Sequence, residues 1–237
     1  MLQILKIRVL VSWGTDFLRC THISTLNSAV ETMINSFKKV AAEQVVIQLA
    51  VITFESKASL YLPLQPVENV SWHELSAGGG TNLADALKMA KGMIEDRSKV
   101  PSRAYRPVVI LVSDGYPFDG WEQPMADFIS SGRSQKCDRM SMLIGDNSAA
   151  TVMEQFLKGS GNRVFFANDA SDIPTFFRFA TMTTVSRATS PTPNTTVALP
   201  DFAYQNTLAA TVTDASNTVA PNFQTTVVMT GEEQDDE

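Results

Sequence analysis

Two short segments of the sequence carry residues that could bind a ligand from a loop. Residues 76–82 read SAGGGTN and place three glycines before the hydroxyl of Thr81. Residues 107–113 (PVVILVS) form an apolar run, which is followed directly by Asp114 and Gly115. A hydroxyl and a carboxylate are hard oxygen donors of the kind that Mg²⁺ prefers. The two segments therefore predict a cation site if the fold brings them together.

Each of these residues also has a simpler structural interpretation. Thr81 precedes a helix that we expect over residues 82–96, and a hydroxyl at that place can cap the helix. Asp114 can begin an Asx-turn into Gly115. The glycine segment is not a phosphate-binding loop of the GxxxxGK[ST] type, because the lysine is missing. The sequence alone leaves the structural and the functional interpretations open.

The elements that must position these residues follow from the hydrophobic pattern. Between residue 4 and about residue 180, short β-rich apolar runs alternate with segments of helical period, which predicts an α/β domain with a mainly parallel sheet. Right-handed crossovers place helices on both faces, and the hairpin at residues 45–62 adds one short antiparallel edge strand. We expect strands at residues 4–11, 45–54, 58–62, 107–113, 139–144 and 163–166, and helices at residues 24–41, 82–96, 121–131, 151–157 and 173–182.

Ligands of such sheets bind where the strands end at their carboxyl side. Three segments that follow strands are therefore expected to meet at one edge of the sheet. They are residues 12–22, 76–82 and 113–120.

The charge distribution separates two parts of the chain. No Lys or Arg follows Arg187, whereas that last segment holds seven Asp and Glu residues. Because the whole chain carries −6, residues 1–187 carry +1. We expect a nearly neutral domain at residues 1–185 and a largely disordered acidic tail, rich in Thr, Ser and Pro, at residues 186–237. The apolar segment ALPDF at residues 198–202 is a candidate for docking on the domain.

Composition also bears on partners and compartment. A nearly neutral body argues against a nucleic-acid partner. The apolar residues 1–11 are interrupted by Lys6 and Arg8 and are too short for a membrane span, so we expect no membrane partner. The cysteines, Cys20 and Cys137, lack the spacing of a zinc site or a disulfide framework, which favours buried thiols and a cytoplasmic protein.

Three segments make a resemblance specific: AVITFESKASLYLPLQPV, LSAGGGTNLADALKMAKGMIE and YRPVVILVSDGYPFDGW. From residue 4 to about 182 the chain resembles a von Willebrand factor type A domain, in particular the bacterial group of TerY-like tellurium-resistance proteins. The resemblance implies a Rossmann-like fold with a metal-ion-dependent adhesion site (MIDAS). In that site, Mg²⁺ is held by a DxSxS loop, a Thr and an Asp, and the last two correspond to Thr81 and Asp114.

The first motif departs from the family. Trp13, Thr15 and Phe17 stand where the DxSxS loop has Asp, Ser and Ser, so two of the three cannot ligate a metal. Thr15 and Asp16 are nearby oxygen donors, although they are off the pattern. Either this chain has abandoned metal-dependent ligation, or the stretch SWGTDFLRCTH is an altered reading of an ancestral loop.

The resemblance implies a non-enzymatic module that binds a protein partner, with weak or lost dependence on Mg²⁺. Gly80, Tyr116 and Trp121 are candidate partner-binding residues, and packing of the aromatic side chains is the alternative for Tyr116 and Trp121. The family also suggests a bacterial or phage setting in stress response or tellurium resistance. A different class of function is a metal-dependent hydrolase, which would need a nucleophile or general base next to Asp114. The histidines, His22 and His73, are expected to be structural or on the surface.

Overall fold

One six-stranded sheet organises the protein. The computed structural model describes residues 5–13, 20–41, 45–76, 79–100, 105–118, 120–145 and 147–189 of the 237-residue chain. The strands are β1 (Leu5–Trp13), β2 (Val45–Phe54), β3 (Ala58–Pro66), β4 (Val108–Ser113), β5 (Asp138–Ile144) and β6 (Phe165–Ala167). They lie in the order β3-β2-β1-β4-β5-β6, and only the β2–β3 pair is antiparallel. This arrangement confirms the predicted α/β fold and its antiparallel edge strand.

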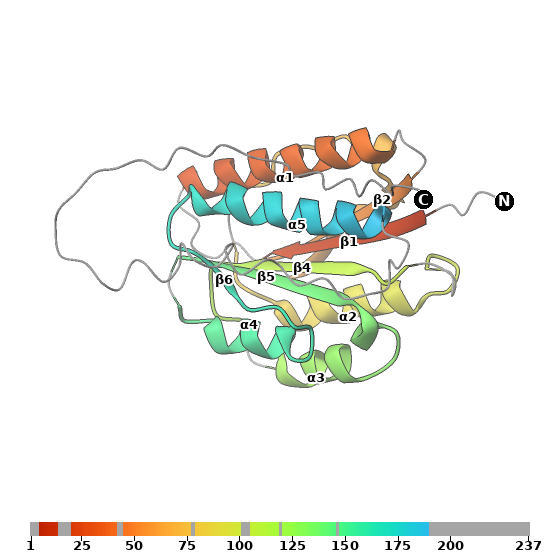
Figure 1. The fold of residues 1–237 in the computed structure, drawn as a ribbon. Helices are drawn as coiled ribbons and strands as arrows, with labels where there is room; N and C mark the ends of the chain where they lie inside the picture. The colour runs from red at the N-terminus through yellow and green to blue at the C-terminus, as the bar shows by residue number, and fades with distance from the viewer. Residues whose placement is uncertain are drawn as a thin grey trace, which may run out of the picture.

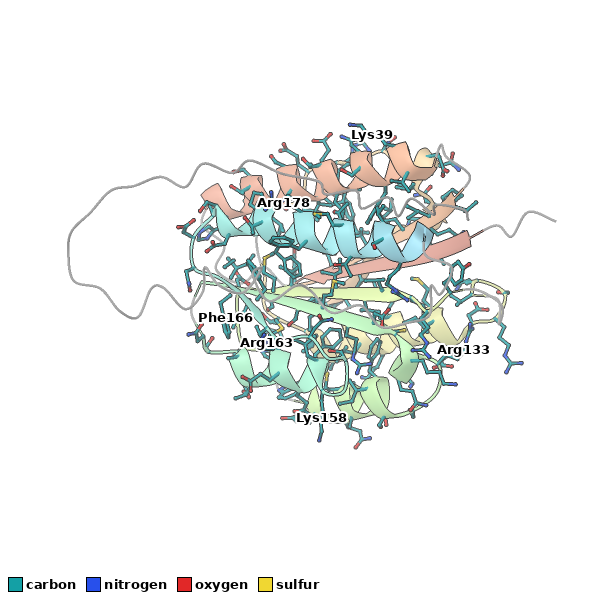
Figure 2. The ribbon with its side chains drawn as sticks, in the orientation of Figure 1. Lys39, Arg133, Lys158, Arg163, Phe166 and Arg178 are labelled. Carbon is teal, nitrogen blue, oxygen red and sulfur yellow. The ribbon has the colours of Figure 1, made fainter. Side chains whose placement is uncertain are left out.

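Helices cover both faces of the sheet, as Figure 1 shows. One face carries α1 (Cys20–Ala41) and α5 (Asp172–Thr189), and the other carries α2 (Leu83–Glu95), α3 (Glu122–Ser130) and α4 (Ala150–Leu157). Two short 3₁₀ turns, η1 (Val67–Asn69) and η2 (Ser134–Lys136), complete the described elements. Lys39 and Lys158 lie on the outer sides of the two helical layers (Figure 2).

Strand β4 shows why the strands of this sheet appear in the sequence as unbroken apolar runs. Its residues alternate between two hydrophobic clusters. Val108, Ile110 and Val112 belong to the α1/α5 side, whereas Val109 and Leu111 belong to the α2/α3/α4 side. Every residue of the strand is buried. A parallel strand that is covered on both faces has no solvent-exposed side, so its sequence does not alternate between apolar and polar residues.

Strand β3 and helix α5 continue well past their predicted ends. Strand β3 continues from residue 62 to Pro66 and contains Pro63. Proline removes a backbone donor, but β3 is at the edge of the sheet, where that donor is not needed. Helix α5 continues to Thr189, seven residues past the predicted end. Its last turns bury Thr183, Thr184 and Arg187, and polar residues on the buried face hide the helical pattern.

Arg187 explains how the end of α5 is held against the sheet. Its guanidinium forms an ion pair with the carboxylate of Asp138, the first residue of β5. Both side chains are almost completely buried. Burial lowers the pKa of Arg187, and the charge of Asp138 opposes that shift. The pair therefore stabilises α5 only while both charges are present.

The substitution Arg187→Ala should destabilise the protein by about 3–5 kcal/mol, because it removes the guanidinium that forms an ion pair with the buried carboxylate of Asp138. The free energy of unfolding of the full chain in urea measures this effect. Lys158→Ala removes a charge from an exposed position and should change that free energy by less than about 0.5 kcal/mol. Equal effects of the two substitutions would contradict the role of the buried pair.

Among the described residues, none of the helices combines the length and hydropathy that a membrane-spanning segment requires. The predicted boundary at residues 185/186 falls inside α5, and residues 190–237 lie outside the described part of the chain. The proposed docking of residues 198–202 lies there too.

Candidate functional site at the carboxyl edge of the sheet

The strand order places a topological switch point beside β1. Trp13, the last residue of β1, is paired with Thr53 of β2 on one side and with Val112 of β4 on the other. The chain leaves β1 toward α1 and leaves β4 toward α3, and these helices cover opposite faces of the sheet. Such a topological switch point is where ligands bind in open α/β sheets.

The glycine loop is anchored to this edge by the β2–β3 turn. The backbone N–H of Asn82 donates to the carbonyl of Glu55 at 2.8 Å. Gly79 has a φ of +81°, and a Cβ there would approach the Cβ of Glu55 to 2.5 Å. A glycine is therefore needed at residue 79 both for the left-handed backbone and for the close approach.

The helix cap is Asn82, and the alternative that Thr81 caps α2 is wrong. The Asn82 side chain accepts a hydrogen bond from the backbone N–H of Asp85 at 3.1 Å and donates to the Asp85 carboxylate at 3.0 Å. An asparagine satisfies the free amide at a helix start as well as a threonine does. Thr81 therefore does not have the helix-capping role that its position in the sequence suggested.

Thr81 is the most unusual polar residue of the site. Its side chain is 1% exposed, and its hydroxyl has no hydrogen-bond partner within the described part of the chain. Its carbonyl accepts hydrogen bonds from the N–H groups of Leu83 and Phe118, each at 3.0 Å. A buried hydroxyl without a partner costs about 1–3 kcal/mol. The same atom is a suitable oxygen ligand for a hard cation.

The bond from Phe118 to Thr81 joins the glycine loop to the loop that carries Asp114. Asp114 is partly buried and directly follows β4. The hydroxyl of Ser113 donates to the Gly115 carbonyl at 3.1 Å and accepts from the Gly115 N–H at 3.4 Å. The structure therefore places Thr81 and Asp114 on two adjoining loops of one edge.

Aromatic residues border this edge. The ring of Phe118 lies against Gly80, so that a Cβ at residue 80 would overlap the ring. Phe118 and Tyr116 are 49% and 50% exposed. Tyr116 packs edge-on against Trp121, with the ring centroids 6.5 Å apart, and Trp121 itself is buried. Of the predicted partner-binding residues, Tyr116 thus presents its ring to solvent, whereas Gly80 and Trp121 are buried.

Of the predicted loop at residues 12–22, the structure describes the two ends, which belong to β1 up to Trp13 and to α1 from Cys20 on. Residues 14–19, with Thr15 and Asp16, lie outside the described residues. Thr81 and Asp114 are therefore the predicted metal ligands that lie within the described residues. No group of three or more His, Cys, Asp or Glu residues with metal-binding geometry occurs in the described ranges. The partnerless hydroxyl of Thr81 fits a cation, and water would have to supply most of the other ligands.

Two positioning residues were missed by the sequence analysis. The side chain of Asn27 donates to the carbonyl of Leu75 and accepts from its N–H, each at 2.9 Å, and so clamps the approach to the glycine loop against α1. A buried polar residue on the apolar face of the helix was the available signal. No sequence pattern indicated the role of Phe118, because its contact with Gly80 joins residues that are far apart in the sequence.

The comparisons with known proteins agree with this fold. Residues 12–117 match the family profile described as von Willebrand factor type A domain. Similar solved structures include a von Willebrand factor type A protein from Catenulispora acidiphila, with 16% identity and a TM-score of 0.60 over 75% of this chain and 42% of that one. The fold is that of a von Willebrand factor type A domain.

Two further solved structures share this von Willebrand factor type A fold. The ArnB paralog VWA2 from Sulfolobus acidocaldarius has 16% identity and a TM-score of 0.53 over 72% of this chain and 43% of that one. Proximal thread matrix protein 1 from the mussel byssus, with a zinc-occupied MIDAS motif, has 15% identity and a TM-score of 0.51 over 75% and 45%. This chain spans less than half the length of these three proteins, and no curated protein matches it.

Gly80→Ala should destabilise the protein by about 1–3 kcal/mol, because the added methyl group displaces the Phe118 ring. The urea unfolding free energy of the full chain measures the change. In a Phe118→Ala background the same substitution should cost much less, since the ring is gone. Gly92→Ala is the matched control: open space surrounds Gly92 in the middle of α2, so this change should stabilise the protein by about 0.5–1 kcal/mol. A Gly80→Ala cost independent of Phe118 would refute the contact.

Proposed function

We propose that this protein is a non-enzymatic interaction module that binds a protein partner at the edge bearing Thr81, Asp114, Tyr116 and Phe118. Von Willebrand factor type A domains commonly mediate protein interactions, and the matched family profile ends in this edge. The observation that carries the proposal is the buried hydroxyl of Thr81, which has no partner among the described residues and lies next to the Asp114 loop. A polar group of this kind needs a ligand from outside.

The proposal includes weak binding of Mg²⁺ by the hydroxyl of Thr81 and the carboxylate of Asp114. A bound cation would supply positive charge for a carboxylate of the partner. Mg²⁺ keeps several waters in many protein sites, so two protein ligands suffice for weak binding. Thr15 and Asp16 are candidates for further ligands. Gly80 serves the same edge, because it lets Phe118 approach the loop that carries Thr81.

Thr81→Val tests the cation site, because valine keeps the shape and removes the hydroxyl. In EDTA the variant should be more stable than the wild type by about 1 kcal/mol, since the unsatisfied group is gone. Millimolar MgCl₂ should raise the melting temperature of the wild type but not that of Thr81→Val or Asp114→Asn. Thermal unfolding and calorimetric titration with Mg²⁺ and Mn²⁺ measure these effects.

The control for this test is Thr184→Val, which removes a buried hydroxyl that already donates to the Ala180 carbonyl at 2.7 Å. This variant should not gain stability in EDTA and should keep its response to Mg²⁺. A wild type with neither binding heat nor a melting shift would eliminate the cation, and the partner would then have to bind to a metal-free surface.

The setting that we propose is a bacterial or phage stress response such as tellurium resistance, in the cytoplasm. Its support is the likeness of GGGTNL and VVILVSDGYP to the TerY-like group. Within this setting the exposed aromatic residues at the edge are the contacts that a partner would cover.

The double substitution Tyr116→Ser/Phe118→Ser should abolish function with little loss of stability, because both rings are about half exposed. A strain that lacks the gene, grown on tellurite and complemented with either form, measures survival. Lys158→Ser changes an exposed residue directly after α4, outside both the aromatic edge and the α1/α5 layer, and should complement fully. Full complementation by the double variant would argue against the aromatic edge, and no tellurite phenotype at all would argue against the setting.

A further inference from the structure

An apolar groove of about 530 Å³ lies between α1 and α5. These two helices lie side by side over one face of the sheet (Figure 1). The floor of the groove includes Ala29 and Met33 of α1 and Phe177 of α5. Arg178, labelled in Figure 2, is the only charged residue among the described residues that line it.

The α1 wall is less polar than its sequence suggests. Ser28, Thr32 and Ser36 follow each other at intervals of four residues. Each hydroxyl donates to the backbone carbonyl four residues earlier, at 3.0, 2.8 and 2.9 Å. The donors are thus used within the helix, and the wall offers mainly carbon atoms to the groove.

The α5 wall is openly hydrophobic. Met182 is 58% exposed, the highest value among the large hydrophobic residues that the structure describes as exposed. Val185 continues the wall, and the hydroxyl of Thr181 donates to the Phe177 carbonyl at 2.6 Å. A groove with carbon atoms on both walls and its floor favours an apolar occupant.

We propose that residues 197–202 of this chain (VALPDF) bind in the groove between α1 and α5. These residues bring four apolar side chains larger than alanine, from Val197, Leu199, Pro200 and Phe202, into a region that is otherwise rich in Thr, Ser and Asn. Asp201 supplies a negative charge that complements Arg178. Because no Lys or Arg occurs after Arg187, this part of the sequence has no cationic side chain that Arg178 would repel.

The chain has the length to reach the groove. Helix α5 forms one wall and ends at Thr189, and the groove extends from Val185 back to Pro174. The eleven steps from Pro174 to Val185 along the helix span about 16 Å. The seven residues 190–196 can span up to about 24 Å when extended, so residues 197–202 can return along the whole groove. A residue that precedes a proline favours an extended backbone over a helical one. Pro191 imposes this preference on Ser190, which favours departure of the chain from the axis of α5.

A cysteine pair tests the proposal in the full chain. Ala198→Cys and Thr32→Cys are combined with Cys20→Ser, and a short bismaleimide links the two new thiols. The native Cys137 does not interfere, because its side chain is buried and burial raises its thiol pKa to about 12. The cross-link should form within one molecule about tenfold faster than in the control pair Ala198→Cys/Glu154→Cys, which joins the tail to α4 on the opposite layer.

Substitutions in the segment and in the groove should lower that rate to the control level. Leu199→Asp/Phe202→Asp removes the anchors, and Met182→Asp places a charge on an exposed position of the groove, where folding tolerates it. The matched tail variant Val219→Asp/Phe223→Asp should leave the rate unchanged.

Three outcomes would overturn the proposal. The first is equal cross-linking in the two cysteine pairs. The second is a rate that does not respond to Leu199→Asp/Phe202→Asp. The third is a product that is a cross-linked dimer at micromolar concentration, because the groove would then hold a second copy. The Mg²⁺ response and the tellurite phenotype do not enter this test, so it can fail independently of the proposed function.

Discussion

The parallel pairing of β1 with both β2 and β4 is the constraint on which the site depends. Because β1 lies in the middle of the sheet, its two neighbours must be reached by crossovers in opposite directions. Helix α1 covers one face and α3 the other, so the chain continues from β1 and from β4 toward opposite faces of the sheet, which makes this carboxyl edge a topological switch point. The hairpin turn at residues 55–57 then holds the glycine loop at the same edge through the Asn82–Glu55 hydrogen bond.

Close packing at this edge has an energetic cost. Gly80 lets Phe118 lie against the loop, and the Phe118 amide binds the Thr81 carbonyl. These contacts bury Thr81 while Asn82 takes the capping role, so the Thr81 hydroxyl loses water without gaining a partner in the described structure. A fold selected for stability alone would place an apolar side chain there. The cost is understandable if the hydroxyl receives a ligand in the functional state.

Helix α5 has two different sides. Toward the sheet it buries aromatic residues together with Arg187, whose ion pair with Asp138 requires that the last turns of the helix stay in place. Toward α1 it leaves Met182 in a groove whose opposite wall is made of serine and threonine residues. The buried pair thus keeps the groove in shape up to Val185, and it fixes the point from which the chain continues beyond Thr189.

The sequence by itself determined the fold class, most of the elements and the identity of Thr81 and Asp114 as candidate ligands. Apolar runs and helical periods reflect burial that every strand and helix needs, so they are legible without the structure. The ends of β3 and α5 were not legible in the sequence. Strand β3 can contain Pro63 because it lies at the edge of the sheet, and Arg187 can be buried because it pairs with Asp138. Only the tertiary structure decided that Asn82 caps α2, that Phe118 lies on Gly80 and that the Thr81 hydroxyl is left without a described partner. Each of these depends on contacts between segments that are close in space but lie on different elements, and no local pattern in the sequence records such contacts.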